Sequence, residues 1–289
     1  MCRSIPRSRR PDRGGGCPAA AASLTAGAAA ILGTPDPAAK ARASAALAEC
    51  WASGTLPTGD SRPPPRPARP PRPALRPPRE MPRRRNFGSP AGRAALLHAL
   101  AHIELNAIDL AWDLVARFAG QGLPREFYDD WVCVAAEEAL HFTLLARRLG
   151  ELGRAYGDLP AHDGLWEAAA ATADDLLARL AVVPLVLEAR GLDVTPAILA
   201  RLEAAGDRDS ALILARILAD EIGHVAIGQR WFDHFCRRAG EDPPAVFRDR
   251  VRRYFKGGLK PPFNRAARDA AGLPAAYYES LGCGAMERC

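Results

Sequence analysis

The chain has 289 residues and a formal net charge of +6 at pH 7. The positive excess lies at the start: residues 1–92 carry 16 Lys and Arg against 5 Asp and Glu, whereas residues 93–289 carry 23 against 28. A mildly acidic remainder argues against a nucleic-acid-binding core. We find no apolar run approaching the roughly 20 residues of a membrane helix, so we expect neither nucleic acid nor membrane as a partner.

The cysteines favour a reducing compartment. They are scattered and odd in number, and no two are spaced Cys-x-x-Cys: Cys2, Cys17, Cys50, Cys133, Cys236, Cys283 and Cys289. We therefore expect reduced thiols in a cytoplasmic protein.

The leading third divides into two parts. Residues 1–35 are rich in Arg, Gly, Pro and Ala, a composition typical of a disordered extension. In residues 36–88, one helix is expected at 37–52, followed by ten prolines interleaved with arginines at 61–82. Such a segment is extended like polyproline II and forms either a linker or a strap along the following domain. Both interpretations stay open.

Residues 89–240 show the apolar periodicity of long amphipathic helices. Ser89 is a good N-cap and Pro90 suits the first helical position. We expect helices from there to about Phe118, then at 124–152, 165–190 with a bend at Pro184, 196–205 after an interruption at 191–196, and 209–238. Residues 153–164 are long enough to cross a bundle. Residues 241–289 are expected to pack on it as a basic helix, at 244–255, and a tail.

Two Glu-x-x-His pairs carry the chemistry: Glu138–His141 and Glu221–His224. Glu104 and Glu188 each stand alone in an apolar helical stripe. A carboxylate on an apolar stripe costs several kcal/mol unless it is compensated, and a divalent metal does so directly. Six ligands of this kind suit a non-haem di-metal centre in a four-helix bundle.

The ligand types and their depths agree with such a centre. Carboxylates with imidazole and no thiolate favour iron or manganese over structural zinc. At a rise of about 1.5 Å per residue, Glu104 and Glu138 reach the same level in an antiparallel hairpin. Glu188 reaches that level only if 196–205 continues the third helix. His98 and His102 lie on another face, so we expect them at a helix–helix contact, or in hydrogen bonds that support the site, rather than as metal ligands.

The chain resembles the ferritin-like di-iron carboxylate superfamily in the order of these ligands. It is similar, over about residues 37–281, to the bacterial ferritin-like proteins catalogued as domain of unknown function 455. The strings that carry this resemblance are LLHALAHIELNAIDLA (96–111), YGDLPAHDGLWE (156–167), AVVPLVLEARGLDVTP (181–196), DEIGHVAIGQRWF (220–232) and LKPPFNRAARDAAGL (259–273). The resemblance implies an all-α fold: a ferritin-like four-helix bundle with a long crossover, an N-terminal Pro/Arg-rich strap and a C-terminal helical extension.

The same resemblance implies roles for the six residues. Glu138 and Glu221 would bridge two iron (or manganese) ions, Glu104 and Glu188 would be terminal ligands, and His141 and His224 would each bind one ion. The implied function is an O2-activating oxidoreductase that uses an unknown small-molecule substrate and an electron donor; a homodimer is compatible with it. The alternatives are an iron-handling ferroxidase or peroxide scavenger, and a non-catalytic metal-stabilised scaffold.

Overall fold

The protein is all-helical. The computed structural model describes residues 21–81 and 87–282, and within these ranges there is no β-strand, only an isolated bridge between Leu75 and Ala161. The expected disorder of residues 1–20 and the cysteines Cys2, Cys17, Cys283 and Cys289 lie outside the described residues.

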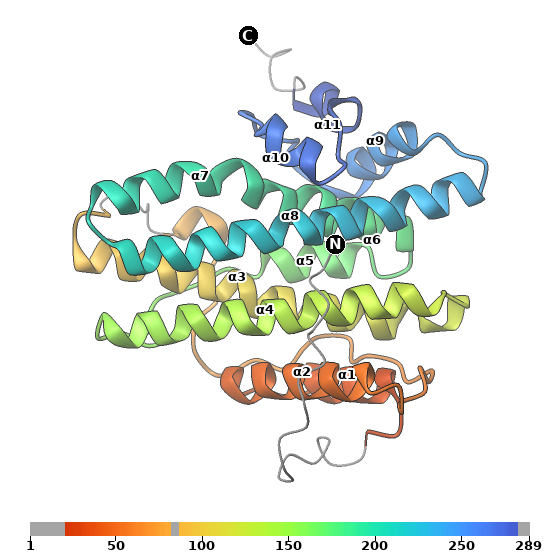
Figure 1. Cartoon of the computed structure of the whole chain (residues 1–289), viewed down its shortest axis with the longest axis horizontal. Coiled ribbons are helices and arrows are strands. Elements are labelled where there is room, and N and C mark those ends of the chain that lie inside the picture. The colour runs from red at the N-terminus through yellow and green to blue at the C-terminus, as the bar shows by residue number, and fades with distance from the viewer. Residues whose placement is uncertain (1–20, 82–86, 283–289) are drawn as a thin grey trace. The chain divides into compact units, whose positions relative to one another are not determined.

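The helices follow the chain in the order shown in Figure 1. Two precede the long pair: α1 (Leu24–Leu32) and α2 (Pro37–Ala52). Next come the short η1 (Pro78–Glu80), α3 (Pro90–Arg117), η2 (Ala119–Gln121) and α4 (Arg125–Glu151). The rest are α5 (Gly164–Ala171), α6 (Leu176–Val182), the π-helical η3 (Val183–Glu188), α7 (Ala189–Ala204), α8 (Arg208–Arg238), α9 (Pro243–Tyr254), α10 (Arg265–Ala270) and α11 (Ala275–Gly282).

The chain forms two compact units, and each is considered by itself. The first comprises Met1–Pro71 and Glu104–Thr143, and the second comprises Arg72–Ile103 and Leu144–Cys289. The boundaries fall inside α3 and α4, so each of these helices contributes residues to both units. The division into four parts at residues 35, 88 and 240 stays a prediction.

The expected N-cap of the first long helix is confirmed. Helix α3 begins at Pro90, and the Ser89 hydroxyl accepts a hydrogen bond from the Gly92 backbone N–H at 3.1 Å. A second cap, Asp207, opens α8 by accepting from the Ser210 N–H at 3.1 Å. Side-chain oxygens at these positions satisfy N–H groups that have no partner inside the helix.

Helix α1 corrects the expectation of disorder for residues 21–35. Its side chains Leu24 and Leu32 are fully buried, and it packs on α2. Gly27 allows the close approach, since a Cβ there would lie 2.6 Å from a Leu47 methyl carbon. The Ala-rich composition concealed a helix that is stable only through burial against its neighbour, because short isolated helices are marginal in water.

The proline-rich segment is a strap over residues 61–71, not a free linker. The Ala68 N–H donates to the Leu32 carbonyl at 2.7 Å. The Arg69 guanidinium donates to the Asn106 side-chain oxygen at 2.6 Å and also pairs with Asp109 on α3. The strap is therefore tied to the first unit at consecutive residues.

Asp109 is the centre of a buried ionic cluster. Its carboxylate is fully buried and pairs with Lys40, which is 1% exposed, as well as with Arg69. Burial raises the pKa of Asp109 despite both cations, and burial lowers the pKa of Lys40 despite Asp109. For both side chains, the cost of removing the charge from water therefore outweighs the attraction of the oppositely charged partners, as expected for buried ion pairs.

The cysteines do not all follow the expectation. Cys50 on α2 and Cys133 on α4 are both disulfide-bonded, so the prediction of reduced thiols is wrong for these two. Their helices pack together, as the hydrogen bonds from Ser44 to the Ala135 carbonyl and from Trp51 to Asp129 show. Cys236 is a free, buried thiol whose pKa is raised by burial to about 12, which fits a small core residue.

The predicted third helix is divided differently from expectation. It breaks after α5, where the Asp175 carboxylate caps α6 by accepting from the Ala178 N–H at 2.9 Å. The helix then continues without interruption from α6 through η3 to α7, which confirms that 196–205 extends it. Residues 191–196 are helical, so the expected interruption is wrong. The irregularity lies around Pro184 in η3, where a bend was expected, because proline removes an N–H and crowds the preceding turn.

Helix α7 tolerates Pro196 because another segment replaces the missing donor. Proline at this position cannot bond the carbonyl four residues earlier, that of Leu192. The Asn264 side-chain N–H donates to this oxygen at 3.1 Å. Arg268 forms a two-pronged ion pair with Asp193, with N···O distances of 2.9 and 2.8 Å. We call this docking of residues 260–268 on α7 the C-terminal clasp.

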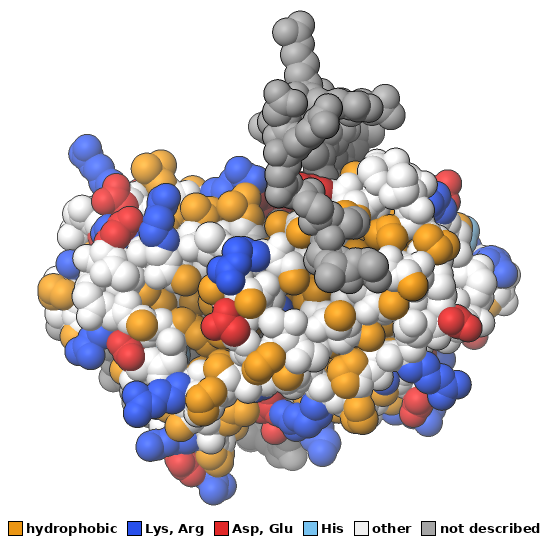
Figure 2. Space-filling view, turned by 90° about the horizontal axis from the view of Figure 1, so that it is seen from below, with side chains coloured by type: hydrophobic (Ala, Val, Ile, Leu, Met, Phe, Trp, Pro, Cys, Tyr) orange, Lys and Arg blue, Asp and Glu red, His pale blue; other side chains and the backbone are white. Residues whose placement is uncertain are grey.

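Helix α3 meets the length and composition of a membrane span, which we had not expected of any segment. However, 78% of its most apolar window is buried inside the protein, as in the core helix of a water-soluble fold. Figure 2 shows one face of the molecule, on which Lys and Arg side chains are dispersed among hydrophobic and acidic ones. The part of this face that the grey residues leave visible has no continuous basic stripe of the kind that follows a nucleic-acid backbone.

Candidate metal centre

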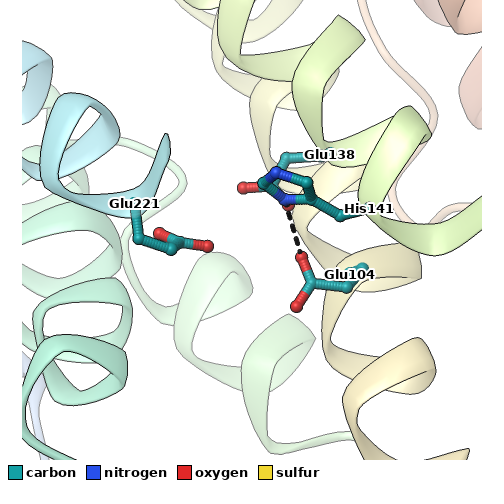
Figure 3. Close-up of side chains that lie close together, drawn as sticks. All are labelled: Glu104, Glu138, His141 and Glu221. Carbon is teal, nitrogen blue, oxygen red and sulfur yellow. Dashed lines mark hydrogen bonds and ion pairs between the residues drawn. The ribbon is translucent and has the colours of Figure 1, made fainter. Parts of the chain in front are cut away.

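Three of the six predicted ligands meet in the first unit. Glu104 on α3 and Glu138 and His141 on α4 each offer an atom within 4.8 Å of those of the other two, and all three are buried. We call them the first ligand set. Figure 3 shows their side chains pointing toward one another, with the His141 ring against Glu104. The Nδ1 atom of His141 lies 3.3 Å from one oxygen of each glutamate.

The α3–α4 hairpin explains why these residues meet. The i, i+3 spacing puts Glu138 and His141 on one face of α4. Glu104 stands as many positions before the end of α3, at Arg117, as Glu138 stands after the start of α4, at Arg125. At equal rise per residue the two therefore reach one level, as the depth argument predicted. Glu137 is half-buried, and Glu138 is fully buried.

The electrostatics of the first ligand set favour a cation. Burial raises the pKa of Glu104 well above its usual value, and repulsion from Glu138 raises it further. One imidazolium can offset the charge of only one carboxylate. A divalent ion would compensate both, and carboxylate oxygens with imidazole nitrogen are ligands that iron and manganese accept. The residues therefore fit a metal ion.

The other three predicted ligands lie in the second unit. On α8, His224 is fully buried and its Nδ1 atom lies 3.5 Å from a Glu221 oxygen. Glu188 is the last residue of η3, which packs on α8, and it is half-buried. We call these three the second ligand set. It repeats the pattern of the first: a Glu-x-x-His pair on one helix and a single glutamate on its neighbour.

His98 and His102 form hydrogen bonds, one of the roles expected of them. His98 accepts hydrogen bonds at Nε2 from the backbone N–H groups of Gly157, at 2.9 Å, and Leu159, at 3.4 Å. The Nδ1 atom of His102 lies 2.8 Å from the Tyr156 hydroxyl. Its Nε2 atom lies 3.0 Å from the His162 carbonyl. Together they hold the 153–163 crossover on α3.

Replacing His102 with alanine is expected to destabilise the protein without removing metal. The change leaves a buried carbonyl and a tyrosine hydroxyl without this partner, at about 1–3 kcal/mol for each unsatisfied group. Urea unfolding measures the loss, and elemental analysis measures the metal content. Loss of metal with unchanged stability would instead make His102 a ligand.

Two features of the second unit, the position of Tyr156 and the Asp193–Arg268 ion pair, were not predicted from the sequence. Tyr156 lies between the histidines, its ring stacked on His98 at 5.3 Å and on His102 at 6.1 Å. The Asp193–Arg268 pair joins positions far apart along the chain, and each side chain is buried. Lys260, Asn264 and Arg268, from the string 259–273, contribute to the clasp.

Comparisons with known proteins identify a family, and the descriptions of the matches name no activity. The family described as "Protein of unknown function (DUF455)" matches residues 33–279. A Haemophilus influenzae relative, described as "Uncharacterized protein", is 44% identical over 201 residues, covering 66% of this chain and 68% of the relative. No solved structure matches.

Proposed function

We propose that this chain, which belongs to the family described as protein of unknown function (DUF455), is a di-iron oxidoreductase that activates O2 to oxidise a small molecule. The observation that carries the proposal is the duplicated arrangement of a Glu-x-x-His pair, whose histidine is fully buried, with a single glutamate on a neighbouring helix. One arrangement lies in each unit. Each set offers two carboxylates and one imidazole, which is enough for one ion.

The proposed fold is a ferritin-like four-helix bundle made by α3, α4, the α6–η3–α7 helix and α8. In such bundles the metal site is built from glutamates and Glu-x-x-His pairs on facing helices. We propose that the two ligand sets combine, with Glu138 and Glu221 bridging two ions and Glu104 and Glu188 as terminal ligands. His141 and His224 would then hold one ion each.

The chain's own residues provide the positions and the water exclusion. The first ligand set is buried, and apolar side chains such as Phe142 and Leu145 on α4 and Ile108 on α3 are buried too. In these surroundings charge on the carboxylates is costly without a cation, so the affinity for a divalent ion is increased. A bound pair of ferrous ions would supply the electrons that reduce O2.

The proposal needs an electron donor and an oxidisable small molecule. It also places the protein in the cytoplasm. The disulfide-bonded Cys50 and Cys133 count against a reducing compartment, since cytosolic thiols are normally kept reduced. Cell fractionation tests this part of the proposal separately from the metal chemistry.

The decisive experiment is metal analysis of protein purified without O2, followed by ferrous loading and exposure to O2 in a spectrophotometer. The proposal expects about two irons per chain. It also expects a transient absorption change on O2 exposure, and an oxidised organic product in a product screen, with O2 accepting the electrons. Iron oxidation that only deposits ferric mineral or removes peroxide would favour an iron-handling protein. Bound metal that does not react with O2 would favour a scaffold.

A further inference from the structure

Helices η3 and α8 are in tight contact beside the second ligand set. Gly228 on α8 lies one helical turn beyond His224 and two turns beyond Glu221, on the same face. It meets Pro184 on η3, which lies one turn before Glu188. The contact is therefore one turn from candidate ligands on both helices.

The contact leaves no room for a side chain. A Cβ atom added at Gly228 would lie 2.4 Å from Pro184 Cβ and 2.6 Å from its Cγ. Proline cannot rotate away, because its ring is bonded to the backbone nitrogen and fixes φ. A methyl group at residue 228 must therefore push the backbones of η3 and α8 apart, rather than turn a flexible side chain aside.

The segments on both sides of η3 are anchored, so the displacement falls on η3 itself. After it, α7 is held by the C-terminal clasp: Arg268 pairs with Asp193 at 2.8 Å, and Arg190 donates to the Lys260 carbonyl at 2.7 Å. Before it, α6 begins at Asp175, which pairs with Arg250 of α9 at 3.0 Å. A shift of η3 moves Glu188, its last residue.

We propose that Gly228 is a positioning residue for the metal centre: its lack of a side chain sets the separation of η3 from α8, and so the distance of Glu188 from Glu221 and His224. This inference rests on the proposed function.

The test is Gly228→Ala in the full-length protein, with metal stoichiometry from elemental analysis and affinity from ferrous-ion titration under anaerobic conditions. Residues that orient metal ligands typically change affinity by about 10–100-fold, and we expect a loss in that range for one of the two ions. The control is Gly223→Ala on the same helix, where a Cβ meets nothing within 4 Å. Gly223→Ala raises the helix propensity by the same amount as Gly228→Ala, and it should keep the wild-type affinity for ferrous ions.

A size swap separates positioning from simple destabilisation. Pro184→Gly removes both ring atoms that the new methyl group meets, so Gly228→Ala combined with Pro184→Gly should recover affinity. Pro184→Ala keeps the Cβ at the 2.4 Å contact and should not. Pro184→Gly alone reports any effect of removing the proline. If Gly228→Ala does not fold, the affinity of the folded double variant decides.

The metal-binding results distinguish failure of the positioning role of Gly228 from failure of the proposed function. Wild-type protein that binds no metal would overturn both. Wild-type protein that binds two ions, with Gly228→Ala binding them equally well, would overturn the positioning role alone. Equal losses of affinity in Gly228→Ala and in the Gly223→Ala control would also overturn it, since the effect would then not come from the contact with Pro184.

Discussion

Glu138→Ala is expected to lose at least one of the two bound metal ions. Glu138 is fully buried and its carboxylate lies against His141, with a ligand atom within 4.8 Å of that of Glu104. In the proposed centre it bridges both ions, so its removal takes a ligand from each. Elemental analysis after anaerobic ferrous loading gives the number of ions per chain.

The neighbouring Glu137→Ala is the matched control, because it removes the same side chain one position along α4 from a half-buried site. It should leave the metal content unchanged. Glu221→Ala should repeat the Glu138→Ala result if the two ligand sets form one centre. Loss of metal in Glu137→Ala but not in Glu138→Ala would show that the helix face was assigned wrongly.

Asp109→Ala is expected to be the most destabilising single change away from the proposed metal centre, at about 3–5 kcal/mol of unfolding free energy. The change leaves the buried ammonium of Lys40 without its carboxylate and removes the partner that holds Arg69 of the strap. The cost arises from a charge left unpaired inside the protein. Urea unfolding of the wild type and the variant measures it.

The matched test removes both buried charges together. Lys40→Met combined with Asp109→Leu leaves no unpaired ammonium, and Arg69, whose side chain is 16% exposed, can turn to water. The double variant should therefore be more stable than Asp109→Ala, as for other buried pairs replaced by apolar residues. If Asp109→Ala cost less than about 1 kcal/mol, the range of an exposed pair, the cluster would contribute nothing beyond surface charge. Limited proteolysis of the strap would show whether it detaches.

The main helices were predictable because their signals are local. Ser89 before Pro90 marked the start of α3, and the expected end near Phe118 and restart at 124 agree with the turn into α4. The meeting of Glu104 with Glu138 and His141 was also predictable. It needs only the i, i+3 spacing on one helix and equal depths in a short-looped hairpin.

The errors have a common physical cause, since each depended on a contact with another segment of the chain. Helix α1 looked disordered because its stability comes from packing on α2. The interruption expected at 191–196 did not occur, because Asn264 supplies the donor that Pro196 lacks. The disulfide-bonded state of Cys50 and Cys133 depends on which helices pack together.

The sequence by itself determined the all-helical class, the starts of the long helices α3, α4 and α8, and the choice of residues that could bind a metal. These follow from capping, periodicity and the cost of an uncompensated carboxylate on an apolar face, all of which are read within a few turns of chain. Only the tertiary structure decided that the strap is tied to Asp109, that the clasp completes α7, and that Gly228 admits Pro184. Each of these joins segments that are far apart along the chain, and a contact between distant segments exists only once the chain has folded.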